Sequence, residues 1–367
     1  MIGSAQFGVM PRPTGDAVSV CRGGDAPTLA EKVEFLSRPT SYEACPGPVV
    51  ARETHMSWVF LVGERVYKLK KPVRFPYLDF STLARREAAC RAELRLNRRL
   101  APDVYLGVIP LTATEGKLAL GDGGDVIDWL VVMRRLDEGG TLEHAIAEKT
   151  IKVWQLDRLV FALVRFYRGA EPSPWSPAVH LRDWGQSLAY NRRVLLDSRL
   201  GLPAGLVRRI DSVQRRFLVC RGRTLTRRIL GRHIVDGHGD LRPEHIWLGD
   251  PVRIIDCLEF NARLRAVDPF DEVAFLSLEC ERLGASWAGD YLRRRVARGL
   301  RDGLTEELFL FYRCHRATLR ARLAIAHLLE ATPRTPEKWP RLARCYLQIA
   351  AADATRLERL LKRRKDR

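Results

Sequence analysis

The chain contains the stretch His238-Gly239-Asp240-Leu241-Arg242-Pro243-Glu244-His245, followed after seven residues by Arg253-Ile254-Ile255-Asp256. Asp240 lies in a segment punctuated by glycine and proline, which is typical of a loop whose side chains can project into a cleft. Asp256 directly follows a short β-branched run that indicates a strand, so a rigid element would present its carboxylate. The two acids, sixteen positions apart, therefore occupy different local settings.

Two carboxylates in these settings match the needs of phosphoryl transfer from a nucleotide. One must accept the hydroxyl proton of the acceptor and the other must hold Mg²⁺ against the phosphates, and the rest is positioning and charge neutralisation. Taken alone, Asp240 is more simply a turn former and Asp256 a strand-terminating acid. The pair, together with partners found upstream, favours the chemical interpretation.

Length and composition restrict the class of protein. A chain of 367 residues exceeds the usual size of one hydrophobic core, so we expect two lobes. Its eight cysteines are scattered without metal-ligand spacing, which indicates buried thiols in a reducing cytoplasm. We find no apolar run long enough to cross a membrane. Residues 1–27 are rich in glycine and proline, lack the order of a secretion signal, and are expected to form a flexible tail.

The net charge of +18 raises the question of nucleic-acid binding. The 62 basic residues comprise 10 Lys and 52 Arg and are dispersed along the chain. Their one concentrated block is Lys362-Arg363-Arg364-Lys365-Asp366-Arg367, which is more simply a solvated terminal charge run. A nucleic-acid partner is therefore not the first expectation.

The hydrophobic pattern predicts an α+β fold of two lobes. Residues 28–136 contain short β-type runs, including a hairpin around Gly63, and one long amphipathic helix over 81–100. They are expected to form a small antiparallel-sheet lobe that binds nucleotide. Residues 137–367 are expected to form a mostly helical lobe, with helices at 142–166, 184–199, 204–221, 270–283, 287–299, 305–329 and 339–361.

The sheet lobe offers a cation and a partner acid for the nucleotide phosphates. Lys68 and Lys70 would share one face of the second hairpin strand, so spacing alone does not choose between them. Lys68 is favoured because it lies inside the β-type run. On the long helix Glu93 and Glu87 are both available, and Glu93 is favoured because it lies nearer the apolar stripe.

The sequence has no P-loop motif and no Gly-x-Gly-x-x-Gly before Lys68. The turn Thr54-His55-Met56-Ser57 is the place where a phosphate-covering loop would lie, with Ser57 as a hydrogen-bond donor.

The chain resembles the aminoglycoside phosphotransferase family, which has the protein-kinase-like fold. The motifs that carry the resemblance are His238-Gly239-Asp240-Leu241, Ile255-Asp256 and the segment from Asp268 to Ala274. The chain is similar in particular to an uncharacterised bacterial branch, through Glu53-Thr54-His55, the segment from Tyr67 to Val73, and Asp256-Cys257-Leu258-Glu259-Phe260. The likeness runs in order over about residues 30–330.

The resemblance implies ATP and Mg²⁺ as cofactors and gives roles to single residues. Asp240 would be the catalytic base and Asp256 the main Mg²⁺ ligand. Lys68, paired with Glu93, would hold the nucleotide phosphates. The segment Met133-Arg134-Arg135-Leu136 would be the hinge that contacts adenine through its backbone.

Supporting roles fall on residues around the two acids. His238 opens the central motif. Asp268 precedes Pro269, which suits a helix N-cap followed by proline at the first helical position. Asp271 would face back and brace the catalytic loop.

Two positions depart from the family pattern. His245 stands where the family usually has an Asn that binds the metal, and imidazole prefers softer metals than Mg²⁺. His245 would therefore contact Mn²⁺ or Mg²⁺-bound water, or it marks a site with altered or lost activity. Arg242 stands where many relatives have His, and could bind an acceptor phosphate or carboxylate.

The sequence thus predicts an ATP-dependent phosphotransferase that acts on a hydroxyl of an unidentified small molecule. The alternatives are a nucleotide-binding pseudokinase or scaffold and a basic nucleic-acid-associated protein. The acceptor pocket is expected from residues 184–193 and 313–322, whose many arginines are compatible with an anionic acceptor. A cationic aminoglycoside would need an acidic cluster, and none is evident in this lobe's sequence.

Overall fold

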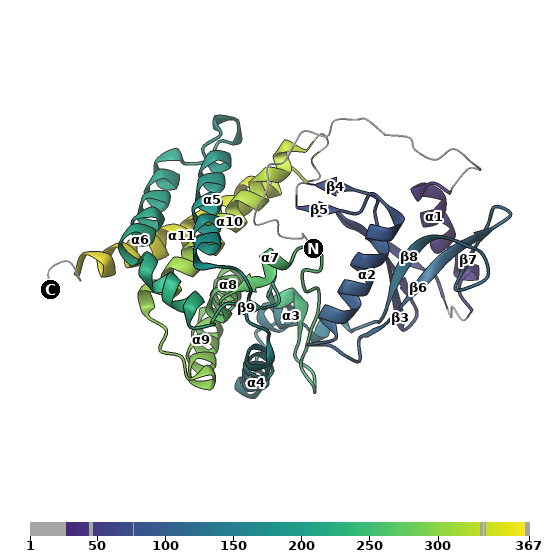
Figure 1. Ribbon diagram of the computed structural model, residues 1–367, viewed down its shortest axis with the longest axis horizontal. Coiled ribbons are helices and arrows are strands. Elements are labelled where there is room, and N and C mark those ends of the chain that lie inside the picture. The colour runs from purple at the N-terminus through teal and green to yellow at the C-terminus, as the bar shows by residue number, and fades with distance from the viewer. Residues whose placement is uncertain (1–26, 44–46, 76, 331–332, 334, 364–367) are drawn as a thin grey trace. The chain divides into compact units, whose positions relative to one another are not determined.

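The computed structural model describes residues 27–43, 47–75, 77–330, 333 and 335–363. The described chain forms two compact units (Figure 1). Unit 1 comprises residues up to 138 together with 253–261, and unit 2 comprises 139–252 and the residues from 262 onward. The predicted α+β fold with a sheet-rich first lobe and a helical second lobe is confirmed. The predicted tail, apart from Pro27, and most of the terminal basic block lie outside the described residues.

Unit 1 is built on a six-stranded antiparallel sheet with the order β1-β2-β3-β8-β6-β7. Its strands are β1 (Val50–Glu53), β2 (Ser57–Val62), β3 (Arg65–Lys70), β6 (Tyr105–Thr114), β7 (Lys117–Leu120) and β8 (Asp125–Arg134). The hairpin between β2 and β3 turns at Gly63, whose φ of 52° is in the left-handed region that glycine adopts without steric cost. Two further strands, β4 (Arg74–Phe75) and β5 (Leu78–Asp79), form a small separate ribbon.

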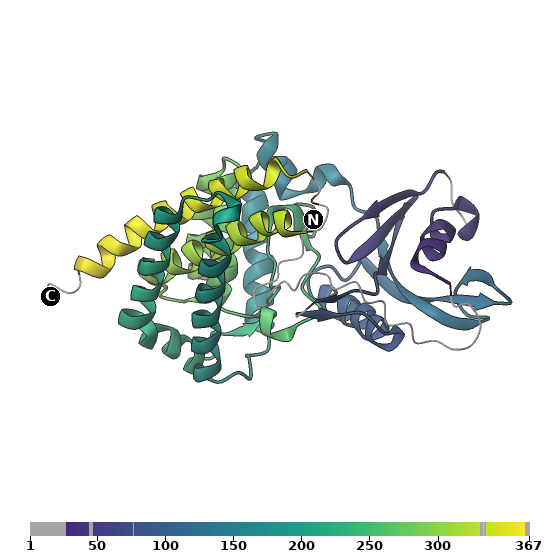
Figure 2. The ribbon, with the colours of Figure 1, turned by 90° about the horizontal axis from the view of Figure 1, so that it is seen from above.

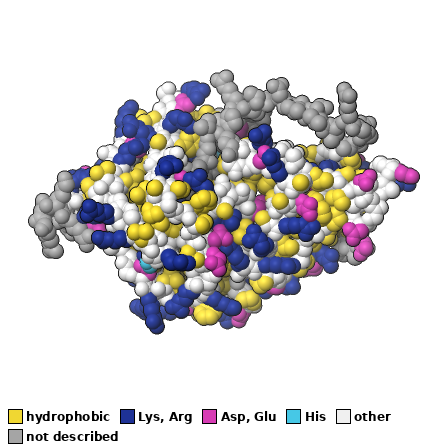
Figure 3. Space-filling model, viewed as in Figure 1, with side chains coloured by type: hydrophobic (Ala, Val, Ile, Leu, Met, Phe, Trp, Pro, Cys, Tyr) yellow, Lys and Arg dark blue, Asp and Glu magenta, His cyan; other side chains and the backbone are white. Residues whose placement is uncertain are grey.

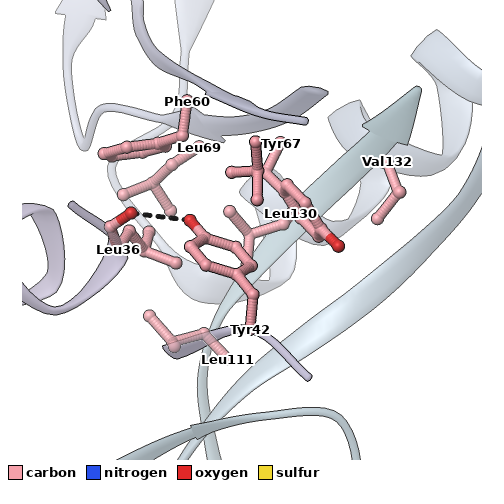
Figure 4. Packing of buried hydrophobic residues seen from close by; sticks show 9 residues of the cluster. Leu36, Tyr42, Phe60, Tyr67, Leu69, Leu111, Leu130 and Val132 are labelled. Carbon is pink, nitrogen blue, oxygen red and sulfur yellow. Dashed lines mark hydrogen bonds between the residues drawn. The ribbon is translucent and has the colours of Figure 1, made fainter. Parts of the chain in front are cut away.

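The two faces of this sheet bury different side chains because strand residues alternate in direction. Tyr67 and Leu69 of β3 enter a core with Leu36, the last residue of α1 (Leu29–Leu36). In this core the hydroxyl of Tyr42 donates a hydrogen bond to the Leu36 carbonyl at 2.6 Å (Figure 4). Val66 belongs to the other core, together with Cys90 of α2. The alternation therefore directs Lys68 and Lys70 to the face that α2 covers.

Helix α2 (Leu83–Asn97) is shorter than the predicted 81–100 and begins at an N-cap, Thr82, whose side chain accepts a bond from the Arg85 amide. Its buried residues recur every three or four positions, which makes one continuous face, and they are Arg86, Ala89, Cys90, Glu93, Leu96 and Asn97. Several are polar, so this face is anchored by ion pairs as well as by apolar contacts. Arg86, for example, pairs with Asp128 of β8 at 2.7 Å.

Residues 253–261 pack with unit 1, whereas the predicted boundary assigned every residue after 136 to the second lobe. Strand β11 (Arg253–Ile254) supplies an ion pair from Arg253 to Asp103 at 2.7 Å. The Cys257 amide donates to the Asn97 side chain at 2.9 Å. These contacts join the segment that carries Asp256 to the C-terminal end of α2, through Asn97, and to the loop that follows this helix, through Asp103.

Unit 2 is mostly helical. Its helices are α3 (Leu142–Ala147), α4 (Val153–Gly169), α5 (Pro177–Leu195), α6 (Ala204–Leu230), α7 (Ala262–Arg265), α8 (Pro269–Arg282), α9 (Ser286–Leu300), α10 (Glu306–Ala326) and α11 (Lys338–Arg363). Short strands β9 (Val235–Asp236), β10 (Ile246–Trp247) and β12 (Ala266–Val267) lie among them. The single helix predicted over 142–166 is wrong, because the chain breaks at Lys149, whose φ is 56°. Figure 2 shows the long helices of this unit from above.

Helix α10 is the centre of unit 2, and its described side chains are buried almost without exception. It carries arginines that pair with acids of neighbouring helices: Arg313 with Asp353 at 3.0 Å, Arg316 with Asp271 at 2.6 Å, and Arg320 with Glu279 at 3.3 Å. Arg313, Arg316 and Arg320 of this helix therefore form internal ion pairs. Their presence does not by itself support an anionic acceptor.

Basic side chains at the surface are dispersed. On the face shown in Figure 3, Lys and Arg lie scattered among apolar and acidic side chains. Within the part of the chain that the structure describes, no helix combines the length and apolar character needed to cross a membrane.

Candidate active site

Unit 1 contains a buried cluster of charges between β3 and α2. Lys68 donates to one oxygen of Glu93 at 2.8 Å, and Lys70 donates to the other at 2.6 Å. Both contacts follow from the strand alternation, which puts the two lysines on one face, and from the position of Glu93 on the buried side of α2. The choice of Glu93 over Glu87 agrees with this geometry, since Glu87 pairs with Arg91 on the surface.

The two lysines differ in what else they contact. Lys70 is fully buried and donates to Glu259 at 2.5 Å. The Lys68 side chain keeps 16% of its exposure and reaches Asp256 at 3.2 Å. Burial lowers the pKa of Lys68, but Glu93 and Asp256 outweigh it and hold the pKa well above its usual value. Lys68 is thus a permanent cation at the open end of the cluster, and Lys70 is its internal support.

Glu93 is ionised in spite of its burial. Burial raises the pKa of Glu93, but Lys68 and Lys70 together lower it by more, so the net shift is downward. A buried carboxylate with two ammonium partners is firmly oriented. Glu93 therefore fixes the position of the Lys68 ammonium.

Asp256 has an unusual backbone conformation. Its φ of 63° is in the left-handed region, which aspartate tolerates better than most residues. Its amide donates to the hydroxyl of Tyr105 at 3.3 Å, and its side chain is 33% exposed. The next amide, of Cys257, is held by Asn97, which itself donates to the Glu93 carbonyl at 2.9 Å. The backbone is thus held so that the carboxylate faces Lys68 while staying open to solvent.

The predicted phosphate-covering turn is closed by its own hydrogen bonds. The Ser57 amide donates to the Thr54 hydroxyl at 2.9 Å, and the Thr54 amide donates to the Ser57 carbonyl at 2.8 Å. Ser57 begins β2 and is only 3% exposed. Its burial does not favour the predicted role of phosphate donor.

The predicted hinge lies at the end of β8. Met133 is a buried strand residue that pairs with Val66 and Tyr105. The amide of Arg134 donates to the Val104 carbonyl and that of Arg135 to the Glu64 carbonyl, both at 2.8 Å. These two N–H groups are therefore already used within unit 1.

Asp240 lies in unit 2, in the loop between β9 and the 3-10 turn Pro243–His245. The loop passes through Gly239, whose φ is 87°, a value suited to glycine. Asp240 is 1% exposed, and Arg242 holds one of its carboxylate oxygens at 3.0 Å. Arg242 also donates to Glu244. The Arg242 guanidinium therefore orients the carboxylate of the candidate base.

His245 is fully buried, and both of its ring nitrogens are engaged. Nδ1 lies 2.9 Å from the Asp240 carbonyl oxygen, which can only accept, so Nδ1 carries the proton. Nε2 lies 3.1 Å from Arg242 Nη2, which can only donate, so Nε2 accepts. His245 is therefore assigned as the neutral tautomer that ties the loop backbone to Arg242.

The brace of this loop is Glu272, in place of the predicted Asp271. The amides of His238 and Gly239 both donate to the Glu272 carboxylate, the former at 3.2 Å, and the hydroxyl of Tyr167 donates to it at 2.8 Å. Asp271 instead pairs with Arg316. The neighbouring helix position points about 100° away, which is why one step along α8 changes the partner.

The predicted cap of α8 is confirmed. Asp268 accepts a hydrogen bond from the Phe270 amide at 3.0 Å, and proline follows at the first helical position. Arg228 and Tyr312 also donate to its carboxylate. His238 accepts from the Asp240 amide through Nδ1 at 3.3 Å, so its ring supports the loop from within.

Residues that the sequence reasoning missed complete both clusters. Glu259 and Asn97 support the lysines and Asp256, and Glu272 supports the loop of Asp240. Glu259 stands three residues after Asp256, and Glu272 follows Asp271 directly. Their short distance in sequence from Asp256 and Asp271 was the signal that could have identified these two glutamates.

The candidate metal ligands differ in their fit to Mg²⁺. Mg²⁺ prefers oxygen and is commonly held by one or two carboxylates with the substrate phosphates. Asp256 offers a partly exposed carboxylate and fits this need. His245 does not fit, because both nitrogens already have partners. No group of three His, Cys, Asp or Glu side chains that could hold a metal occurs among the described residues.

Glu244 gives this loop a pH dependence. Burial raises its pKa, but Arg242 lowers it more, to about 2 from an ordinary 4.5. A depressed carboxyl pKa stabilises the fold above the ordinary value, and this stability is lost as pH falls toward the folded-state pKa. We expect Glu244→Gln to be less stable than wild type by up to about 3 kcal/mol at pH 7, with the gap closing between pH 4.5 and 2. Urea unfolding at several pH values measures the gap, and a constant gap would contradict the prediction.

No family model matches the chain. An uncharacterised protein of Mycobacterium tuberculosis strain H37Rv is 33% identical over 289 residues, which cover 77% of this chain and 56% of that protein. A protein of Mycobacterium bovis, also uncharacterised, matches to the same extent. The chain thus spans little more than half the length of the curated relatives that it matches.

Two solved structures share the fold. A choline/ethanolamine kinase family protein from Mesorhizobium loti matches with a TM-score of 0.50 and 15% identity, over 88% of this chain and 98% of that one. The choline kinase from Cryptosporidium parvum Iowa II matches with a TM-score of 0.54 and 9% identity, over 90% and 96%. The chain has the two-lobed protein-kinase-like fold, as predicted. At these identities the likeness concerns the fold alone.

Proposed function

We propose that this protein is an ATP-dependent phosphotransferase that moves the γ-phosphoryl group to a hydroxyl of a small molecule. The observation that carries the proposal is the contact of Lys68 with both Glu93 and Asp256. A fixed cation beside a partly exposed carboxylate is the arrangement that nucleotide phosphates and their metal require. The small-molecule kinases that share the fold support the same reaction class.

Each cluster supplies a different part of the reaction. Lys68, fixed by Glu93, would neutralise charge on the nucleotide phosphates. Asp256 would hold Mg²⁺, which when bound neutralises the charge that develops on the transferred group. Asp240 would accept the proton of the acceptor hydroxyl. Arg242 keeps the Asp240 carboxylate in one orientation through its 3.0 Å contacts.

The test is transfer of a labelled γ-phosphate from ATP by the purified protein. The acceptor panel contains polyols, sugars, amino alcohols and aminoglycosides, each with Mg²⁺ and with Mn²⁺. We expect transfer to at least one hydroxylated acceptor. Normal ATP binding with no transfer to any of them would instead favour a nucleotide-binding pseudokinase, the second candidate.

The pseudokinase alternative rests on His245, which occupies the usual position of a metal-binding Asn. The hydrogen bonds of His245 support a positioning role, so we expect that activity does not depend on it as a metal ligand. We expect His245→Leu to lose the bonds to Asp240 and Arg242, to lower kcat about tenfold, and to destabilise the fold by about 1–3 kcal/mol.

The ratio of activity with Mg²⁺ to activity with Mn²⁺ separates the two roles of His245. A positioning residue leaves this ratio unchanged in the variant, whereas a metal ligand changes it. A tenfold change in the ratio would show that the assignment from the hydrogen bonds is wrong.

A further inference from the structure

Unit 2 contains a cavity of about 50 Å³ bordered by α5, α6, α10 and the start of α8, all labelled in Figure 1. One side is apolar, with Leu225 and Ile229 of α6. Another is aromatic, with Trp184 of α5 and Tyr312 of α10, whose ring centroids lie 5.7 Å apart. One residue from each segment expected to form an acceptor pocket, Trp184 from 184–193 and His315 from 313–322, lines this cavity.

The charges in the wall cancel in pairs. Three carboxylates line the cavity, each with an arginine partner, and the pairs are Asp183 with Arg263, Asp268 with Arg228, and Asp271 with Arg316. Burial lowers the pKa of both lining histidines, His180 and His315, so they are neutral at pH 7. A charged ligand would thus meet no uncompensated opposite charge among the described lining residues.

One side chain that lines the cavity, His315, has a polar atom without a hydrogen-bond partner among the described residues. His315 is 3% exposed, and its Nε2 lies 2.7 Å from the Ser187 hydroxyl. Its Nδ1 is buried with no hydrogen-bond partner among the described residues. A buried polar atom without a partner costs about 1–3 kcal/mol, which a ligand group could recover. A hydroxyl suits this atom because it can donate or accept, whichever tautomer Ser187 selects.

We propose that this cavity binds a small neutral molecule that carries hydroxyl groups, one of which hydrogen-bonds to His315. Its carbon framework packs against Trp184 and Tyr312, and its other hydroxyls face the polar part of the wall. Asp240 is not among the described lining residues. The site is therefore defined separately from the phosphoryl-transfer residues, and the inference does not depend on the proposed function.

Isothermal titration calorimetry without nucleotide tests the site. The probes are three neutral polyols, namely glycerol, D-ribose and myo-inositol, with choline as the cation and D-glycerate as the anion. We expect at least one neutral polyol to bind and neither charged probe to bind more tightly. We expect His315→Leu to weaken polyol binding about tenfold, the effect of one lost hydrogen bond with its desolvated partner.

A second variant keeps the test informative if His315→Leu fails to fold. Ala266 lines the cavity and is partly exposed, so Ala266→Leu reduces the cavity volume while residue 315 stays histidine, and should also abolish binding. His144→Gln changes an exposed histidine of the same unit and should bind as wild type does. The proposal is overturned if no neutral polyol binds, if a charged probe binds more tightly, or if Ala266→Leu binds like wild type.

Discussion

Replacing Glu93 with alanine is expected to destabilise the protein by about 3–5 kcal/mol, the usual cost of breaking a buried ion pair by removing one partner. Lys68 and Lys70 both depend on this carboxylate, at 2.8 and 2.6 Å, and Lys70 is fully buried. Without Glu93, Lys70 keeps Glu259 and Lys68 keeps Asp256 as partners. Lys68 would then neutralise the acid that is proposed to hold the metal, so transfer activity should fall as well.

Urea unfolding measures the loss of stability. Glu87→Ala is the matched control, because Glu87 lies on the same helix but pairs with Arg91 at the surface, where such a pair contributes about 0–1 kcal/mol. Glu93→Gln retains the shape of the side chain and should lie between the two. A loss below 1 kcal/mol in Glu93→Ala would mean that the two lysines find other partners and that Glu93 does not support them.

The sequence predicted those parts of the site that depend on local periodicity. Strand alternation placed Lys68 and Lys70 on one face, and helix periodicity favoured Glu93 over Glu87. The same rules do not distinguish the two lysines, because both lie on the correct face of the strand. The difference between them is Glu259, which accepts a hydrogen bond from Lys70 and lies 189 residues further along the chain.

The sequence failed where a partner is chosen by a long-range contact. Asp271 and Glu272 are adjacent acids in the first turn of α8. Only the folded structure shows that the amides of the Asp240 loop donate to Glu272 and not to Asp271. The arginines of α10 posed the same difficulty. Their sequence alone is compatible with an anionic ligand, yet Arg313, Arg316 and Arg320 form internal ion pairs.

Residues 253–261 illustrate the limit most clearly. The strand before Asp256 was identified from its β-branched run, but its place in unit 1 depends on contacts with Asp103 and Asn97. Nothing in the local pattern specifies these partners. The left-handed backbone conformation at Asp256, with φ of 63°, also could not be predicted from the local sequence, because aspartate is only modestly enriched in the left-handed region.

Replacing Asp240 with asparagine is expected to lower kcat for phosphoryl transfer by about 10²–10⁴, the range that a general base contributes. Asparagine keeps the shape of the side chain and one oxygen for Arg242, and Glu244 remains to neutralise that guanidinium. The fold should therefore survive, and binding of ATP should change little. The loss should appear in kcat far more than in the KM for ATP.

The control for the Asp240 variant is Asp250→Asn, an exposed acid of the same unit whose pair with Arg158 lies at the surface. It should leave kcat, KM and the urea midpoint unchanged. Transfer is followed with labelled γ-phosphate and the fold with urea unfolding, so loss of the base is distinguished from loss of structure. If Asp240→Asn folds normally and retains more than a tenth of the wild-type kcat, Asp240 is not the base, and its buried contact with Arg242 serves the architecture of the loop alone.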